Sequence, residues 1–102
     1  MDRVKVYERI DQEREYQETC RAACNWQPAE GKPPESFVVY MERYLDRAAE
    51  ATLLAANKNR PEVLANIRKV VALGVACLEV HGCPQREPKD VHKRLDNSRR
   101  IG

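Results

Sequence analysis

Apolar residues recur every three or four positions along three stretches of the chain, a spacing that places them on one side of an α-helix. Proline-containing connections separate these stretches, and proline interrupts a helix interior. The expected helices span residues 3–24, 35–57 and 61–81. We therefore predict an all-α fold, with a single helical domain over residues 1–86 and a short basic segment over residues 87–102.

The apolar stripes of the expected helices differ in width. In the first helix the stripe is narrow and mixed with polar residues, and in the second it runs from Phe37 to Ala55. The third helix contains an unbroken apolar run, Val70 to Leu78, so we expect it to be the central helix, covered on several sides. Two partner helices, one of them polar, leave part of it exposed. We therefore predict that a second copy of the chain completes a helical bundle.

Local signals mark the ends of the third helix. Asn59 and Glu62 have the spacing of a capping box, which satisfies free N–H groups in the first helical turn. Gly82 suits the left-handed position that follows a helix, and Pro84 prevents the helix from continuing. We expect this helix to end at His81.

Charge and composition exclude several classes of protein. The 102 residues include 18 Lys and Arg against 16 Asp and Glu, and the net charge of +2 is too small to indicate a nucleic-acid-binding protein. Six basic and three acidic residues fall between Arg86 and Gly102, so the positive charge is concentrated there. The longest apolar run has nine residues, against about 18 for a membrane-spanning helix. With no secretion signal either, we expect a cytoplasmic protein without a membrane span.

The four cysteines are candidates for metal ligands. Cys20 and Cys24 share a helix face, and Cys77, His81 and Cys83 fall within a short span. Neither group has the tight C-x2-C spacing typical of zinc sites, and free cysteine is commonly buried as a small apolar residue. We therefore expect these thiols to be structural.

Carboxylates on helices are the main candidates for chemistry, because the sequence has no phosphate-binding glycine loop, metalloprotease motif or nucleophile elbow. Glu42, Asp46 and Glu50 recur every four residues and share one helix face, and Glu15 belongs to a similar row on the first helix. Two such faces would supply the oxygen ligands that Mg²⁺ prefers. The alternative is a solvated face, since arginines alternate with these acids.

Three segments of the sequence resemble the MazG-like all-α nucleoside triphosphate pyrophosphohydrolases, above all their short phage-type relatives, over residues 4–86. The segments are Glu13-Arg14-Glu15-Tyr16-Gln17 followed by Trp26, Tyr40-Met41-Glu42-Arg43-Tyr44-Leu45-Asp46 with Ala48 and Ala49, and residues 67–79 running into His81-Gly82-Cys83-Pro84. The resemblance implies a helical bundle that oligomerises through its central helices. It also implies a site in which carboxylates hold Mg²⁺ against a triphosphate while water attacks the α-phosphorus and pyrophosphate leaves.

The metal motifs of this family are altered in the chain. The first motif, E-E-x-x-E, falls on Glu42, Arg43 and Asp46, so a base stands where the second acid belongs. The second motif, E-x-x-D, falls in one of two registers around Asn66, and neither keeps a carboxylate pair. In one of these registers Lys69 replaces the aspartate. Cations and amides in place of anionic ligands remove most of the attraction for Mg²⁺.

These substitutions favour a MazG-like protein that has lost catalysis but keeps a nucleotide site. In that interpretation, Arg43, Arg47 and Lys69 bind the phosphates that a metal would otherwise neutralise. Trp26 or Tyr16 then sets the choice of base. Such a protein would bind, sense or sequester a nucleotide.

Two alternatives follow from the same residues. An active Mg²⁺-dependent pyrophosphohydrolase would use Glu42 and Asp46 as metal ligands, with Glu15 or Glu50 as additional acids. A non-enzymatic helical assembly or adaptor protein would dock a partner through its basic C-terminal segment. Its melting temperature would not change when a nucleotide is added.

Overall fold

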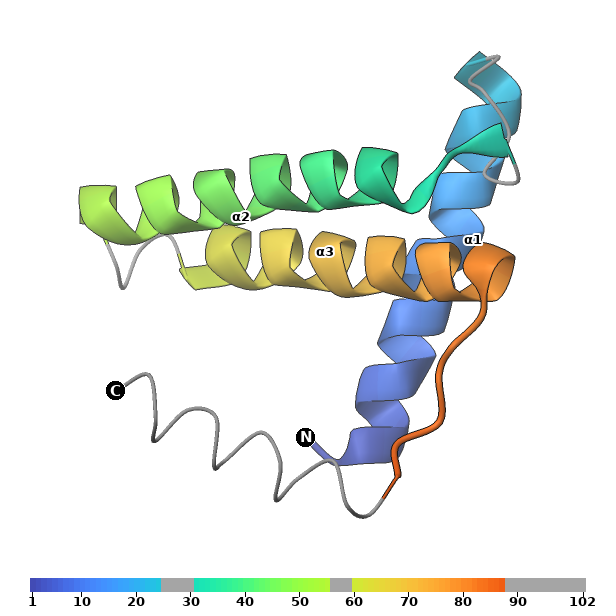
Figure 1. The fold of residues 1–102 in the computed structure, drawn as a ribbon. Coiled ribbons are helices and arrows are strands. Elements are labelled where there is room, and N and C mark those ends of the chain that lie inside the picture. Colours follow the sequence, from blue (N-terminus) through green and yellow to red (C-terminus); the bar gives the residue numbers. More distant parts are fainter. Residues whose placement is uncertain (25–30, 56–59, 88–102) are drawn as a thin grey trace, which may run out of the picture.

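The structure is a computed structural model that describes residues 1–24, 31–55 and 60–87 (Figure 1). The described residues form three helices and no strand: α1 (Arg3–Cys24), α2 (Pro34–Ala55) and α3 (Arg60–His81). The all-α prediction is confirmed, and the helix ends lie close to the expected ones. No described helix has both the length and the apolarity that crossing a membrane requires.

The helix α3 lies at the centre of the described fold. Helices α2 and α3 run side by side in opposite directions, and α1 crosses α3 at a steep angle (Figure 1). Within the described residues α1 packs against α3 and not against α2. The prediction that the most apolar helix is the central one is therefore confirmed for this part of the chain.

Local sequence explains where the helices begin and end. The backbone N–H of Lys5 donates a 2.9 Å hydrogen bond to Oδ1 of Asp2, which caps the first turn of α1. Pro34 begins α2, a position where the missing N–H of proline costs nothing. Gly82 has a φ of 96° and its N–H donates to the Leu78 carbonyl at 2.9 Å, so the predicted left-handed end of α3 is confirmed. The predicted capping residue Asn59 lies outside the described residues.

The core between the helices consists largely of small side chains. Its buried apolar members are Ile10, Phe37, Ala48, Ala51, Ala72 and Ala76. Alanines allow two helix backbones to approach closely, which fits the contact of α3 with both other helices. Two polar residues, Glu13 and Asn66, are also buried. The Asn66 amide donates to the Glu62 carbonyl at 2.9 Å, so its burial is compensated within α3.

Large apolar side chains on a third side of α3 are exposed. Leu64, Ile67, Val71 and Leu78 are each more than two-fifths exposed, and their spacing places them on one helix face. Arg68 and Glu79, by contrast, reach α1 from another face. The central helix therefore packs on two sides and leaves one apolar side uncovered by the described residues.

Candidate functional site

Two tyrosine rings on α2 each have two cations beside them. The Lys32 Nζ atom lies 5.1 Å from the centroid of the Tyr40 ring, and Cζ of Arg43 lies 5.7 Å from the same centroid. These distances fall within the range of cation–π attraction. The complete group, called the cation–tyrosine cluster below, consists of Lys32, Tyr40, Arg43, Tyr44, Arg47 and Lys69.

The second tyrosine of the cluster joins two helices. Cζ of Arg47, on α2, lies 5.2 Å from the centroid of the Tyr44 ring, and Nζ of Lys69, on α3, lies 5.4 Å from it. Tyr44 is half-buried between these cations. Because α2 and α3 pack along each other, a lysine from one helix reaches a ring on the other.

A repeated sequence pattern builds most of the cluster. Residues 40–47 read Tyr-x-x-Arg twice in succession, so each arginine follows a tyrosine by three positions. Side chains at this spacing are neighbours on a helix surface. The tyrosines themselves are four residues apart and therefore stand one helical turn from each other, about 6 Å along the axis.

The cluster is a concentration of positive charge. Within the described part of the chain, none of its four cations forms an ion pair with a carboxylate. The ring faces hold the cations in place while their remaining N–H donors are available to a ligand. A guanidinium group offers two parallel donors to a phosphate or carboxylate, and an ammonium group adds a compact charge. The arrangement is therefore suited to an anionic ligand.

The structure brings together three of the residues that the sequence predicts for nucleotide binding. Arg43, Arg47 and Lys69 all belong to the cluster. Tyr16 lies exposed on α1, which within the described residues does not pack against α2, and so it is not part of the cluster. Trp26 lies outside the described residues. Lys32 and the two tyrosines were not predicted as site residues, although the Tyr-x-x-Arg repeat was a signal for the tyrosines.

The predicted metal ligands are spread over two helices. Glu42, Asp46 and Glu50 are exposed on α2, and Glu15 is exposed on α1. Among the residues that the structure describes, no three His, Cys, Asp or Glu side chains lie together as they would around a metal ion. Among the described carboxylates the buried one is Glu13, which was not predicted as a site residue.

Two adjacent residues of α1 form ion pairs with α3. Glu13 accepts a 2.7 Å hydrogen bond from Nε of Arg68. Arg14 donates to both carboxylate oxygens of Glu79, from Nε at 3.2 Å and from Nη2 at 3.0 Å. Nη2 of Arg14 also lies 3.0 Å from Glu18. These pairs fix α1 on the central helix.

The Arg14 guanidinium also changes the acidity of its partner. Its hydrogen bonds to Glu79 hold the pKa of that carboxyl below its ordinary value of 4.5, and its charge acts in the same direction. Burial opposes this shift by disfavouring the charged form. The pair with Arg14 therefore favours the ionised form of Glu79.

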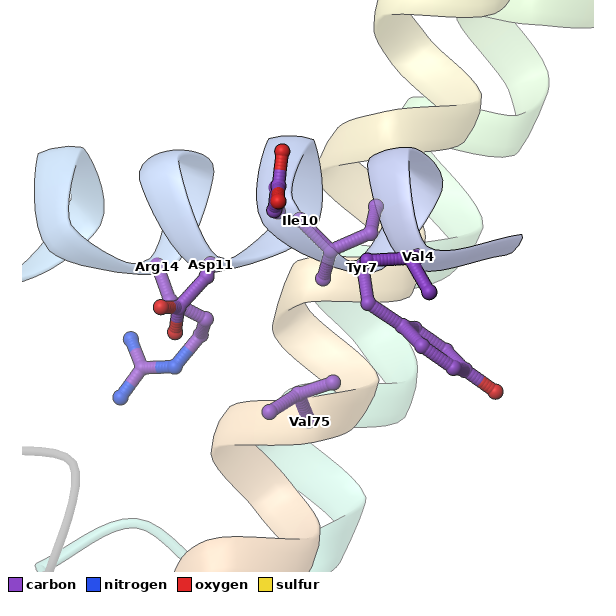
Figure 2. Close-up of a pocket in the computed structure, with 7 residues that line it drawn as sticks. Val4, Tyr7, Ile10, Asp11, Arg14 and Val75 are labelled. Atoms are coloured by element: carbon purple, nitrogen blue, oxygen red, sulfur yellow. The ribbon is translucent and has the colours of Figure 1, made fainter. Parts of the chain in front are cut away.

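An open groove of about 450 Å³ lies where α1 crosses α3 (Figure 2). It is lined by Val4, Tyr7, Glu8, Ile10, Asp11, Arg14 and Val75. Figure 2 shows Tyr7, Asp11 and Arg14 on the side of α1 that faces Val75 of α3. Its one cation, Arg14, already binds carboxylates, whereas Glu8 and Asp11 form no ion pair within the described residues. The groove is therefore less suited to an anion than the cation–tyrosine cluster.

No protein family model, curated protein or solved structure matches this chain.

Proposed function

We propose that this protein binds a nucleotide through the cation–tyrosine cluster, as a MazG-like protein without catalysis. The observation that carries the proposal is the gathering of four cations around two tyrosine rings, with no carboxylate paired to any of them in the described part. Positive charge that forms no ion pair with a carboxylate can attract an anion. The resemblance of the sequence to nucleoside triphosphate pyrophosphohydrolases supports a nucleotide as that anion.

The cations themselves replace the metal in this proposal. In an Mg²⁺ enzyme, the ion neutralises the phosphates while carboxylates hold the ion. Here Arg43 occupies a position of the family's acidic motif, and its guanidinium lies over Tyr40. In one of the two registers of the second motif Lys69 occupies the position of the aspartate, and it lies over Tyr44. Both substitutions put a fixed positive charge where the family places a metal ligand, which favours direct phosphate binding.

Nucleotide binding is tested by calorimetry and thermal shift with nucleoside triphosphates, monophosphates and cyclic nucleotides, each with and without Mg²⁺. We expect binding and a higher melting temperature without metal, and no release of pyrophosphate. Arg47→Ala combined with Lys69→Ala should weaken binding at least tenfold, since each removes a charge-assisted contact of about 1.5–3 kcal/mol. The matched control is Arg9→Ala, because Arg9 is an exposed arginine on α1 without an ion pair in the described residues.

Two other outcomes would contradict the proposal in different ways. Binding that requires Mg²⁺ and releases pyrophosphate would establish the alternative, an active hydrolase that uses Glu42 and Asp46. No binding of any nucleotide would leave the assembly or adaptor protein as the better explanation.

We also propose that the chain forms a homo-oligomer through the exposed apolar side of α3. The carrying observation is the row of Leu64, Ile67, Val71 and Leu78, together with a core so small that no large side chain is completely buried among the described residues. A two-fold axis places the same row from two copies in contact, which buries both. The same surface would serve the alternative function of an assembly protein.

The setting we propose is the cytoplasm, where free thiols such as Cys77 stay reduced.

Analytical ultracentrifugation tests the oligomer. Ile67→Asp combined with Val71→Asp should shift the protein to monomers, because two charges on each side of the contact are too costly to bury. Leu53→Asp is the control, since Leu53 is 87% exposed and belongs to α2, whereas the row belongs to α3. A wild-type monomer at all concentrations, or dissociation by Leu53→Asp alone, would contradict the proposed interface.

A further inference from the structure

Lys32 differs from the other cations of the cation–tyrosine cluster because it does not belong to a helix. Arg43, Arg47 and Lys69 are placed by α2 and α3, whereas Lys32 lies two positions before α2 begins. Its Nζ atom nevertheless lies 5.1 Å from the centroid of the Tyr40 ring. Fixing a long, flexible side chain over a ring costs conformational entropy, and this cost is smaller if the backbone is already fixed.

Two features hold the backbone of Lys32. Pro33 and Pro34 follow it, and proline fixes its own φ and restricts the residue before it to an extended conformation. The carbonyl of Lys32 also accepts a hydrogen bond from Nε2 of His81, at 2.8 Å. Since a carbonyl oxygen only accepts, Nε2 is the nitrogen that carries the proton. This bond connects the end of α3 with the segment that precedes α2.

His81 is itself held in place. The left-handed Gly82 ends α3 directly after it, and the N–H of Gly82 is bonded to Leu78. The imidazole ring meets the Phe37 ring edge to face, with 6.3 Å between the ring centroids. Phe37 is only 3% exposed, so the histidine stands against a fixed part of the core.

We propose that His81 is a positioning residue of the anion site: by binding the Lys32 carbonyl, it holds the Lys32 ammonium over Tyr40, where it contributes to ligand binding. This inference rests on the proposed function of the cluster. It adds that one of the four cations depends on the C-terminal end of α3. It also divides the cluster into three cations placed by the helices and one, Lys32, placed by the prolines that follow it and by the hydrogen bond from His81.

A double-mutant cycle with inorganic tripolyphosphate as the probe tests the role of His81. Lys32→Ala should weaken binding about fivefold, the effect of losing one partly exposed charge of about 1 kcal/mol. His81→Phe keeps a ring against Phe37 but has no donor, and should weaken binding two- to fivefold. In the Lys32→Ala background, His81→Phe should have no further effect, because the side chain that it positions is gone.

Two further variants separate positioning from general damage to the fold. His81→Gln retains a side-chain N–H donor and should restore most of the affinity that His81→Phe loses. Lys69→Ala should lower affinity by the same factor whether or not His81 is present, because Lys69 is placed by α3 itself. His81→Ala repeats the comparison without an aromatic ring. Melting temperatures of all variants show whether each is folded at the temperature of the titration.

The outcomes distinguish this inference from the function on which it rests. Failure of the wild-type protein to bind tripolyphosphate would overturn both. Normal binding by wild type together with unchanged affinity in His81→Phe and His81→Ala would overturn the role of His81 alone. An equal loss of affinity from His81→Phe with and without Lys32 would do the same, since the effect would then not pass through Lys32.

Discussion

Arg68 and Glu13 form the shortest ion pair between helices in the described structure, with 2.7 Å between Nε of the arginine and Oε1 of the glutamate. The two side chains are unequal, because Glu13 is 7% exposed while Arg68 is nearly half exposed. A buried carboxylate loses its hydration and needs a partner to compensate. The buried Glu13 carboxylate therefore depends on Arg68 to compensate its lost hydration, whereas the arginine is still partly hydrated.

Removing the arginine should destabilise the fold. Arg68→Ala leaves the buried Glu13 carboxylate without its partner, and we expect the free energy of unfolding to fall by about 1–3 kcal/mol. Arg9→Ala, which removes an exposed arginine from α1, should change it by less than about 0.5 kcal/mol. Urea unfolding followed by circular dichroism measures both. Equal effects of the two variants would show that the pair contributes no specific stability.

Acid should weaken the fold partly through Glu79. Its pKa is lowered in the folded protein by Arg14, so its stabilising contribution is complete above the ordinary value of 4.5. That contribution is lost as the pH falls through the lowered pKa of the folded state. In Glu79→Gln, the free energy of unfolding should fall less over the same interval. Glu50→Gln is the control, because it removes an exposed carboxylate of α2 that forms no ion pair within the described residues.

The two glycines of the α3 region should respond in opposite directions to alanine. Gly82 has a φ of 96° with open space where a Cβ would stand, so Gly82→Ala carries only the backbone cost of about 1–2 kcal/mol. Gly74 is helical, and a Cβ there would meet Sδ of Met41 at 3.8 Å, an ordinary contact. Gly74→Ala should therefore stabilise the protein by about 0.5–1 kcal/mol. Thermal melts of the pair reveal whether the signs differ as expected.

The crossing of α1 over α3 should depend on a small residue at position 72. Ala72 is 0% exposed and shares a helix face with Arg68 and Glu79, both of which bind α1. Ala72→Leu should separate the two helices and lower stability by about 1–3 kcal/mol. Ala49→Leu, at an exposed position of α2, should be nearly neutral. A neutral Ala72→Leu would mean that α1 is not packed closely at this point.

The helices were predictable from the sequence because the signals for them act within a few residues. Pro34 and Gly82 fix helix ends through their own backbone geometry, and the observed ends agree with that reasoning. The steep crossing of α1 was not predictable. It depends on Glu13 and Arg14 finding partners on α3 that are 55 and 65 positions away in sequence. Charged residues in a polar helix are otherwise typical of a solvated surface.

The candidate site was predictable to a similar extent. Arg43 was predicted from its place in an altered acidic motif, and Arg47 was predicted as a further base on the same helix; the cluster contains both. Their cation–π contacts follow from helix spacing, so the tyrosines were within reach of the same reasoning. Lys32 was not, because its carbonyl is hydrogen-bonded to His81, 49 residues along the chain. Contacts of this kind have no local signature in the sequence.

Within the described part of the chain α1 is attached to α3 and not to α2, which has a consequence for the order of folding. Helices α2 and α3 are consecutive and pack along their lengths, so their contacts close a short loop, whereas α1 must wait until α3 exists. We expect the α2–α3 pair to form first and α1 to join last, and to detach first. In native-state hydrogen exchange, the backbone amides of α1 should open at lower free energy than those of α3.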